Sequence, residues 1–149
     1  MNLTLAGVIL GTSTPLLLAG ETLAATLPNL APGSQFRYVF VTSETRDPSS
    51  TDISDYNTFV NNVAVLGTET SNIQGDWKAI VSTATTNAKV NTNTLGDAGV
   101  PIFRVDGVKV ADDYSDLWDF SIDNPINITE NGVVGGTFFV YTGSPDILV

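Results

Sequence analysis

Aspartates are the side chains of this sequence whose type and spacing could do chemistry. Between residues 106 and 123, Lys109 is the one basic residue among six acids, which are Asp106, Asp112, Asp113, Asp116, Asp119 and Asp123. Ca²⁺ takes six to eight oxygen ligands in flexible geometry, and carboxylates with loop carbonyls at this spacing could supply them. The candidate metal ligands are therefore Asp112, Asp113, Asp116, Asp119 and Asp123. The alternative is a solvated acidic loop whose aspartates cap turns.

Trp118 lies inside this acidic run and has two possible roles. Exposed in a loop, its ring could stack on a sugar, with Asp116 and Asp119 as the neighbouring ligand contacts; buried, it would anchor the loop to the core. Two of the carboxylates could also form the acid/base pair of a glycan hydrolase, which requires a separation of about 5–9.5 Å that sequence does not give. Such a pair usually needs a deep cleft, for which a chain of 149 residues has little material. We therefore expect no enzymatic activity.

The composition limits the kinds of partner. The chain has no His and no Cys, which removes most zinc, copper and haem ligation and the Ser-His and Cys-His nucleophile pairs. Sixteen acidic and six basic residues give a net charge of −10, which repels a phosphate backbone, so no nucleic-acid partner is expected. Cations, a polysaccharide or surface glycan, and a second copy of the chain remain as partners.

The sequence divides into an N-terminal segment, a linker and one domain. Residues 3–20 are uncharged and mostly apolar, so residues 1–25 read as a signal peptide cleaved near Ala24 or Ala25, or as a retained assembly strand that adds to a neighbour's sheet. Pro15 interrupts the apolar run, which argues against a stable membrane span. Residues 26–35 contain two prolines and a glycine and are predicted to be a linker, and residues 36–149 a single β-rich domain.

The domain is predicted to be α+β, with an all-β sandwich as the alternative. Phe36, Tyr38 and Phe40 alternate along a predicted strand at 36–42. One amphipathic helix is predicted at 52–66, where apolar residues recur at helical spacing. Residues 77–83 are a second predicted strand, and residues 84–99, rich in Asn and Thr, a predicted loop.

Two dipeptides predict hairpins in an antiparallel sheet. Asp106-Gly107 separates short apolar runs at 101–105 and 108–110, and Asn131-Gly132 separates 126–130 from 133–134. Asp-Gly and Asn-Gly favour the two-residue turn in which both central residues have positive φ. A further strand is predicted at 137–142.

The ordered set of strands and motifs resembles secreted bacterial surface proteins that carry a divergent C-type-lectin-like or endostatin-like domain, often with PEP-CTERM sorting tails. The resemblance rests on residues 38–43, 77–80, 100–104, 106–107, 117–119, 125–126 and 140–143. It implies an α+β fold beneath a loop-rich region, which in lectins carries the Ca²⁺ and sugar site. Phe120 stands where Gly is expected, the sugar-binding Glu-Pro-Asn or Gln-Pro-Asp triplet is missing, and the domain is shortened at its C-terminus.

These observations predict a secreted or cell-surface binding or adhesion domain, with calcium as its possible ion. A structural subunit of an extracellular filament or matrix, assembled by strand exchange, is the first alternative. The carboxylate-pair glycan hydrolase is the second.

Overall fold

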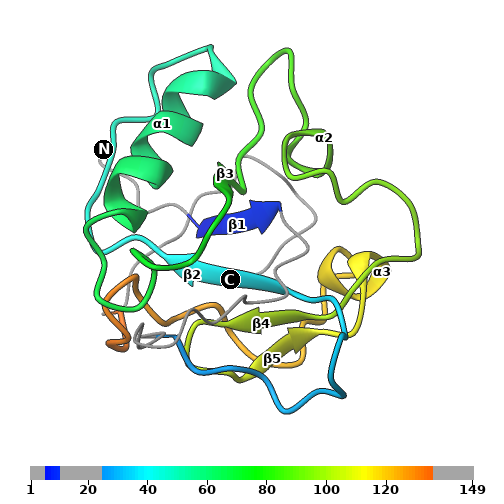
Figure 1. Ribbon diagram of the computed structural model, residues 1–149. Coiled ribbons are helices and arrows are strands. Elements are labelled where there is room, and N and C mark those ends of the chain that lie inside the picture. The colour runs from blue at the N-terminus through cyan, green and yellow to red at the C-terminus, as the bar shows by residue number, and fades with distance from the viewer. Residues whose placement is uncertain (1–5, 11–24, 136–149) are drawn as a thin grey trace.

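The computed structural model describes residues 6–10 and 25–135 of the 149-residue chain (Figure 1). The strands are β1 (Ala6–Leu10), β2 (Arg37–Val41), β3 (Asp76–Ala79), β4 (Ile102–Arg104) and β5 (Lys109–Ala111), and the helices are α1 (Ile53–Ala64), α2 (Ala88–Asn91) and α3 (Tyr114–Leu117). The strand predicted at 137–142 lies outside the described residues. The α+β class is confirmed, and the all-β sandwich is wrong for the described residues, whose named strands form one sheet packed with helices.

The sheet has the strand order β3-β1-β2-β4-β5. The pairs β1–β2, β1–β3 and β4–β5 are antiparallel, whereas β2 and β4 are parallel, so the sheet is mixed and not antiparallel throughout as predicted. The reason lies in the connection, because a chain that leaves β2 through α1, β3 and α2 can return beside β2 in the same direction.

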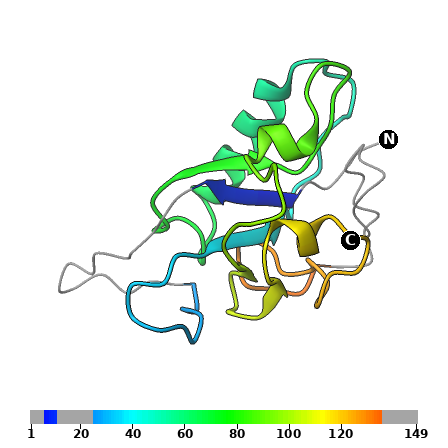
Figure 2. The same ribbon diagram turned by 90° about the vertical axis from the view of Figure 1, so that its right-hand side faces the viewer.

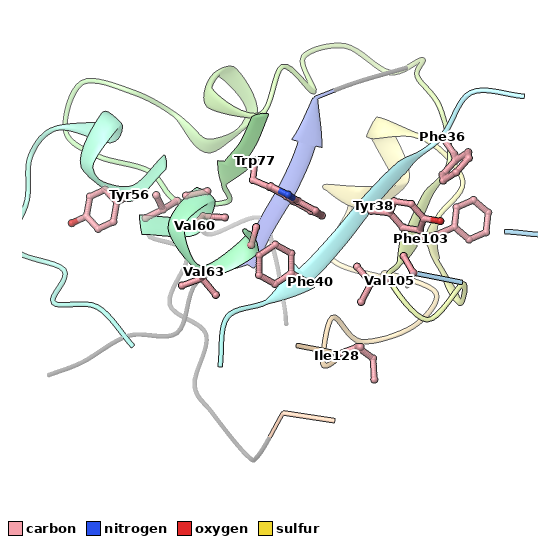
Figure 3. Close-up of a cluster of buried hydrophobic side chains, with 14 residues drawn as sticks. Phe36, Tyr38, Phe40, Tyr56, Val60, Val63, Trp77, Phe103, Val105 and Ile128 are labelled. Atoms are coloured by element: carbon pink, nitrogen blue, oxygen red, sulfur yellow. The ribbon is translucent and has the colours of Figure 1, made fainter. Parts of the chain in front are cut away.

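Hydrophobic cores lie on both faces of the sheet, and β2 is therefore buried along its whole length. The first core, on the α1 side, contains Tyr38 and Phe40 of β2, and the second, on the α3 side, contains Val39 between them. Figure 3 shows Val60 of α1 beside Trp77 in the first core, where the rings of Phe40 and Trp77 meet edge to face at 4.7 Å. The alternation predicted from sequence at 36–42 is therefore confirmed, with apolar residues on both faces.

Helix α1 forms where the periodicity predicts it, two residues shorter at its C-terminal end. The Asp52 side chain caps the helix by accepting a hydrogen bond from the Ser54 N–H at 2.9 Å. Tyr56, Val60 and Val63 form the buried face. The predicted loop at 84–99 contains the short helix α2, capped by the Asn87 side chain, because Asn accepts from the helix's first N–H groups.

Both Gly-containing turns form, but with a different geometry from the one predicted. Gly107 and Gly132 have φ of +84° and +72°, whereas the Asp106 and Asn131 before them do not have positive φ. In the first turn the Arg104 N–H donates to the Val108 carbonyl at 2.8 Å. These are three-residue loops that end in a left-handed glycine, so glycine is required at one position of each turn and not at two.

The N-terminal part of the chain contributes an interior strand of the sheet. Residues 6–10 form β1, between β2 and β3, with Val8 opposite Val39 on one side and Lys78 on the other. Figure 2 shows β1 running through the middle of the molecule, between α1 and the β4–β5 hairpin. The predicted linker, residues 26–35, lies against the domain: the Thr26 carbonyl accepts from the Tyr38 hydroxyl at 3.0 Å.

Candidate functional site

The acidic run is held by β5, α3 and the turn that follows them. The Asp113 side chain caps α3 by accepting from the Asp116 N–H at 3.0 Å, and the Asp116 carboxylate accepts from the Asp112 N–H at 2.6 Å. This reciprocal bonding resembles a capping box and satisfies N–H groups that a helix start leaves without partners. It also fixes the direction of both carboxylates.

Three of the five predicted metal ligands converge. Asp112, Asp116 and Asp123 each place a carboxylate oxygen within 4.8 Å of the others, and we call these three residues the aspartate trio. Their side chains reach this point from the end of β5, from α3 and from the loop after it. Asp116 is half-buried, whereas Asp112 and Asp123 are exposed.

Lys109 supplies the positive charge at the trio. Its ammonium contacts the Asp112 carboxylate and lies 3.0 Å from Asp123 Oδ2. The hydrogen bonds to Asp112 and Asp123 raise the pKa of Lys109 above its usual value, because each carboxylate favours the protonated amine. Three carboxylates and one ammonium leave the trio with a net charge of about −2, which attracts a divalent cation.

The other two predicted metal ligands are used locally. Asp113 is the cap of α3, and Asp119 accepts a hydrogen bond from the Ser121 N–H at 2.9 Å. Asp106, at the start of the acidic run, binds Arg104 with both carboxylate oxygens, at 3.0 and 2.7 Å. Partial burial pushes the pKa of Asp106 upward, but the hydrogen bonds from Arg104 and Val108 together lower it. The turn-capping alternative thus describes Asp113 and Asp119.

Trp118 is buried. Of the two roles that the sequence left open, burial fits the one in which Trp118 anchors the loop to the core. Its side chain is 6% exposed, and Nε1 donates to the Thr94 Oγ1 at 2.9 Å. The Lys89 ammonium lies 5.4 Å from the ring centroid, a cation–π distance. A buried indole with a bonded N–H has little surface for stacking on a sugar, so Trp118 anchors the acidic loop to the core.

Phe120 is the exposed aromatic residue at this loop, and sequence reasoning missed it. Its side chain is 54% exposed, and its φ of +71° lies in the left-handed region that favours glycine. A bulky residue there costs roughly 1–2 kcal/mol of backbone strain. The available signal was the Phe found where the resemblance leads one to expect Gly. Strain held at an exposed aromatic next to carboxylates suggests a functional position.

Glu130 is a second residue, after Phe120, that the sequence analysis did not single out. It is 3% exposed and accepts hydrogen bonds from the Ser43 N–H at 2.9 Å, from the Ser43 hydroxyl and from Asn131 Nδ2 at 2.8 Å. These donors compensate the burial of the carboxylate. Its role is to tie the Asn131-Gly132 turn to the end of β2.

No family model, curated protein or solved structure matches this chain. In the part of the chain that the structure describes, no helix has the length and apolar character required to cross a membrane. The geometry of the trio and of the sheet is therefore the basis for functional proposals.

Proposed function

We propose that this chain is a non-enzymatic binding or adhesion domain that is secreted or held at a cell surface, with a calcium-dependent ligand contact at the aspartate trio. The observation that carries the proposal is the convergence of three carboxylates from separate elements within 4.8 Å. Lys109 offsets part of the repulsion between these carboxylates, and Ca²⁺ favours such a cluster of carboxylate oxygens.

The trio leaves room for a ligand on the ion. Three carboxylates supply three to six oxygens, and Ca²⁺ takes six to eight, so carbonyls, waters or ligand hydroxyls would complete the shell. Vicinal hydroxyls of a polysaccharide or surface glycan fit this requirement. Phe120, exposed at the same loop, offers an apolar ring for the adjacent sugar face.

Lys109 sets the affinity of the proposed site. Its ammonium occupies two of the three carboxylates, so a cation must displace it before binding. The long side chain is 37% exposed and can turn into solvent. We therefore expect weak to moderate calcium affinity, which is typical of extracellular modules whose dissociation constants are about 10⁻⁴–10⁻³ M.

Calcium titration of the whole chain tests the proposal. Calorimetry and thermal melting with Ca²⁺, compared with Mg²⁺ and with chelator, should show heat of binding and a higher Tm with Ca²⁺ alone. Asp123→Asn should lower the affinity at least tenfold, because it removes a trio oxygen and its charge. Asp97→Asn removes the same charge from an exposed position outside the trio and should leave binding unchanged.

A substitution of Lys109 tests the same calcium site from the opposite direction. Lys109→Met removes the competing ammonium and should tighten calcium binding several-fold, because the trio keeps all three carboxylates. If neither the unaltered chain nor Lys109→Met shows heat or a change in Tm with millimolar Ca²⁺, the calcium site is refuted.

Absence of catalysis is part of the same proposal and has its own test. The chain lacks His and Cys, and two of its three converging carboxylates are exposed to solvent. We expect no turnover of a panel of glycans. Turnover that disappears in Asp116→Asn while the variant remains folded would establish the hydrolase alternative.

A further inference from the structure

The interior strand β1 is joined to β2 by a long connection. Ala6–Leu10 pairs with β2 on one side and β3 on the other, and residues 11–36 separate it from β2 along the chain. In the strand order, β3 meets the rest of the sheet through β1. A strand that a long connection joins to the next one can give up its place to the same strand of a second copy, which keeps β3 paired to the sheet.

The outer edge of β3 is closed by asparagine side chains. Asn61 Oδ1 accepts from the Trp77 N–H at 3.0 Å and its Nδ2 donates to the Trp77 carbonyl at 2.6 Å. Asn57 Oδ1 accepts from the Ala79 N–H at 2.9 Å, and Asn91 Nδ2 donates to the Ala79 carbonyl at 2.8 Å. Figure 1 shows β3 between α1 and α2, the helices that provide these side chains. Because the asparagines take the backbone groups that an added strand would use, β3 cannot recruit one here.

The outer edge of β5 is also occupied. The Val110 carbonyl accepts from the Asp123 N–H at 2.9 Å, and the Lys109 carbonyl accepts from Asn124 Nδ2 at 2.9 Å. The chain after α3 thus covers this edge. With these backbone groups bonded, the two outer strands of the described sheet offer few partners for edge-to-edge growth.

Within the described sheet, the position left for strand pairing between molecules is that of β1. We propose that the slot between β2 and β3 accepts residues 6–10 of a second copy of this chain, giving strand-exchanged dimers or longer chains. The register Val8–Val39 and Val8–Lys78 is the same whether β1 comes from its own or a second copy, so exchange retains the strand pairing of β1. Concentration and the reach of residues 11–36 then set the balance between the closed and the exchanged forms.

The negative charge of the chain makes strand exchange dependent on salt. At a net charge of −10, two copies repel each other, and salt screens this repulsion over a Debye length of about 8–10 Å. The exchanged fraction should therefore increase with ionic strength as well as with protein concentration. Calcium binding at the aspartate trio should show the opposite dependence, because salt screens the attraction between Ca²⁺ and the carboxylates, and this separates the two proposals.

Disulfide trapping in the full chain tests the exchange. The sequence has no cysteine, so Val8→Cys and Lys78→Cys variants each carry a single thiol. The two variants are mixed, unfolded in urea, refolded together and oxidised, and disulfide-linked heterodimers are measured on a non-reducing gel. Exchange should give at least fivefold more heterodimer than Val8→Cys mixed with Val133→Cys, whose exposed position on the Asn131-Gly132 hairpin is not opposite Val8.

Two further variants keep the test decisive. Val8→Cys mixed with Val39→Cys reports the other side of the slot and should also exceed the control. A single chain carrying both Val8→Cys and Lys78→Cys should form intermolecular disulfides in a fraction that rises with concentration. The proposal is overturned if the double variant closes within one chain at every concentration, if it forms no disulfide, or if the intact mass of the native protein shows that residues 6–10 are missing.

Discussion

Replacing Asn61 with alanine should open the outer edge of β3. The Asn61 amide accepts from the Trp77 N–H and donates to the Trp77 carbonyl, at 3.0 and 2.6 Å. The substitution removes both partners at once from a residue that is 2% exposed. Alanine cannot replace either bond, and the backbone of Trp77 faces the helix, with little access for water.

The structure sets the size of the effect. Leaving a buried polar group unpaired costs about 1–3 kcal/mol, and two groups at this partly buried edge together cost about 2–3 kcal/mol. Alanine recovers up to about 0.7 kcal/mol by its higher helix propensity. The free energy of unfolding should therefore decrease by about 1.5–2.5 kcal/mol, which lowers Tm by about 3–10 °C for a domain of this size.

Urea unfolding followed by tryptophan fluorescence measures this loss. Trp77 and Trp118 are both buried, so their emission reports the loss of the packed state. Asn62→Ala is the matched control, because Asn62 is the next residue of the same helix and is exposed. Its effect should be a gain of at most about 0.7 kcal/mol, from the same helix propensity.

One result would refute the reasoning. If Asn61→Ala and Asn62→Ala unfold at the same urea concentration with the same slope, water satisfies the backbone of Trp77 and the edge of β3 is not sealed by α1. The sealed edge also predicts that Asn61→Ala associates at concentrations where Asn62→Ala remains monomeric, because the freed groups can pair with another strand.

Three other predictions test the core and the turns. Trp118→Phe loses the 2.9 Å bond to Thr94 and should cost about 1–2 kcal/mol in urea unfolding, with calcium affinity unchanged. Burial raises the pKa of Tyr38 to about 12, so its stabilising contribution should be intact below about pH 10, where both states are protonated, and lost between about pH 10 and 12. Absorbance titration of Tyr38→Phe against the unaltered chain measures this ionisation, and an ordinary titration near pH 10 for every tyrosine would contradict it. Gly107→Ala should cost more in Tm than Gly33→Ala: both have positive φ, near +85°, but the added methyl at Gly107 would lie 2.9 Å from a threonine side chain, whereas at Gly33 it meets open space. Equal losses would show that the close approach carries no energy.

The sequence determined the features that depend on neighbouring residues. A capping aspartate before an apolar period specified α1, alternating aromatic residues specified β2, and a left-handed glycine fixed each turn. In each case a few consecutive residues contain the physical cause, namely a side-chain bond to a nearby N–H, a two-residue repeat or the lack of a Cβ. The acidic run was also visible in the sequence, because its aspartates lie close together along the chain.

Only the tertiary structure decided how these pieces meet. It placed β1 inside the sheet, between β2 and β3, and β2 parallel to β4, and it assigned Trp118 to the core. It also showed which aspartates form the trio. Asp113 and Asp119 have the same side chain as the trio but accept hydrogen bonds from nearby backbone N–H groups instead of joining it. These outcomes depend on contacts between residues far apart in the chain, whose energies exceed local preferences, and no local pattern encodes which distant group will come within hydrogen-bond distance.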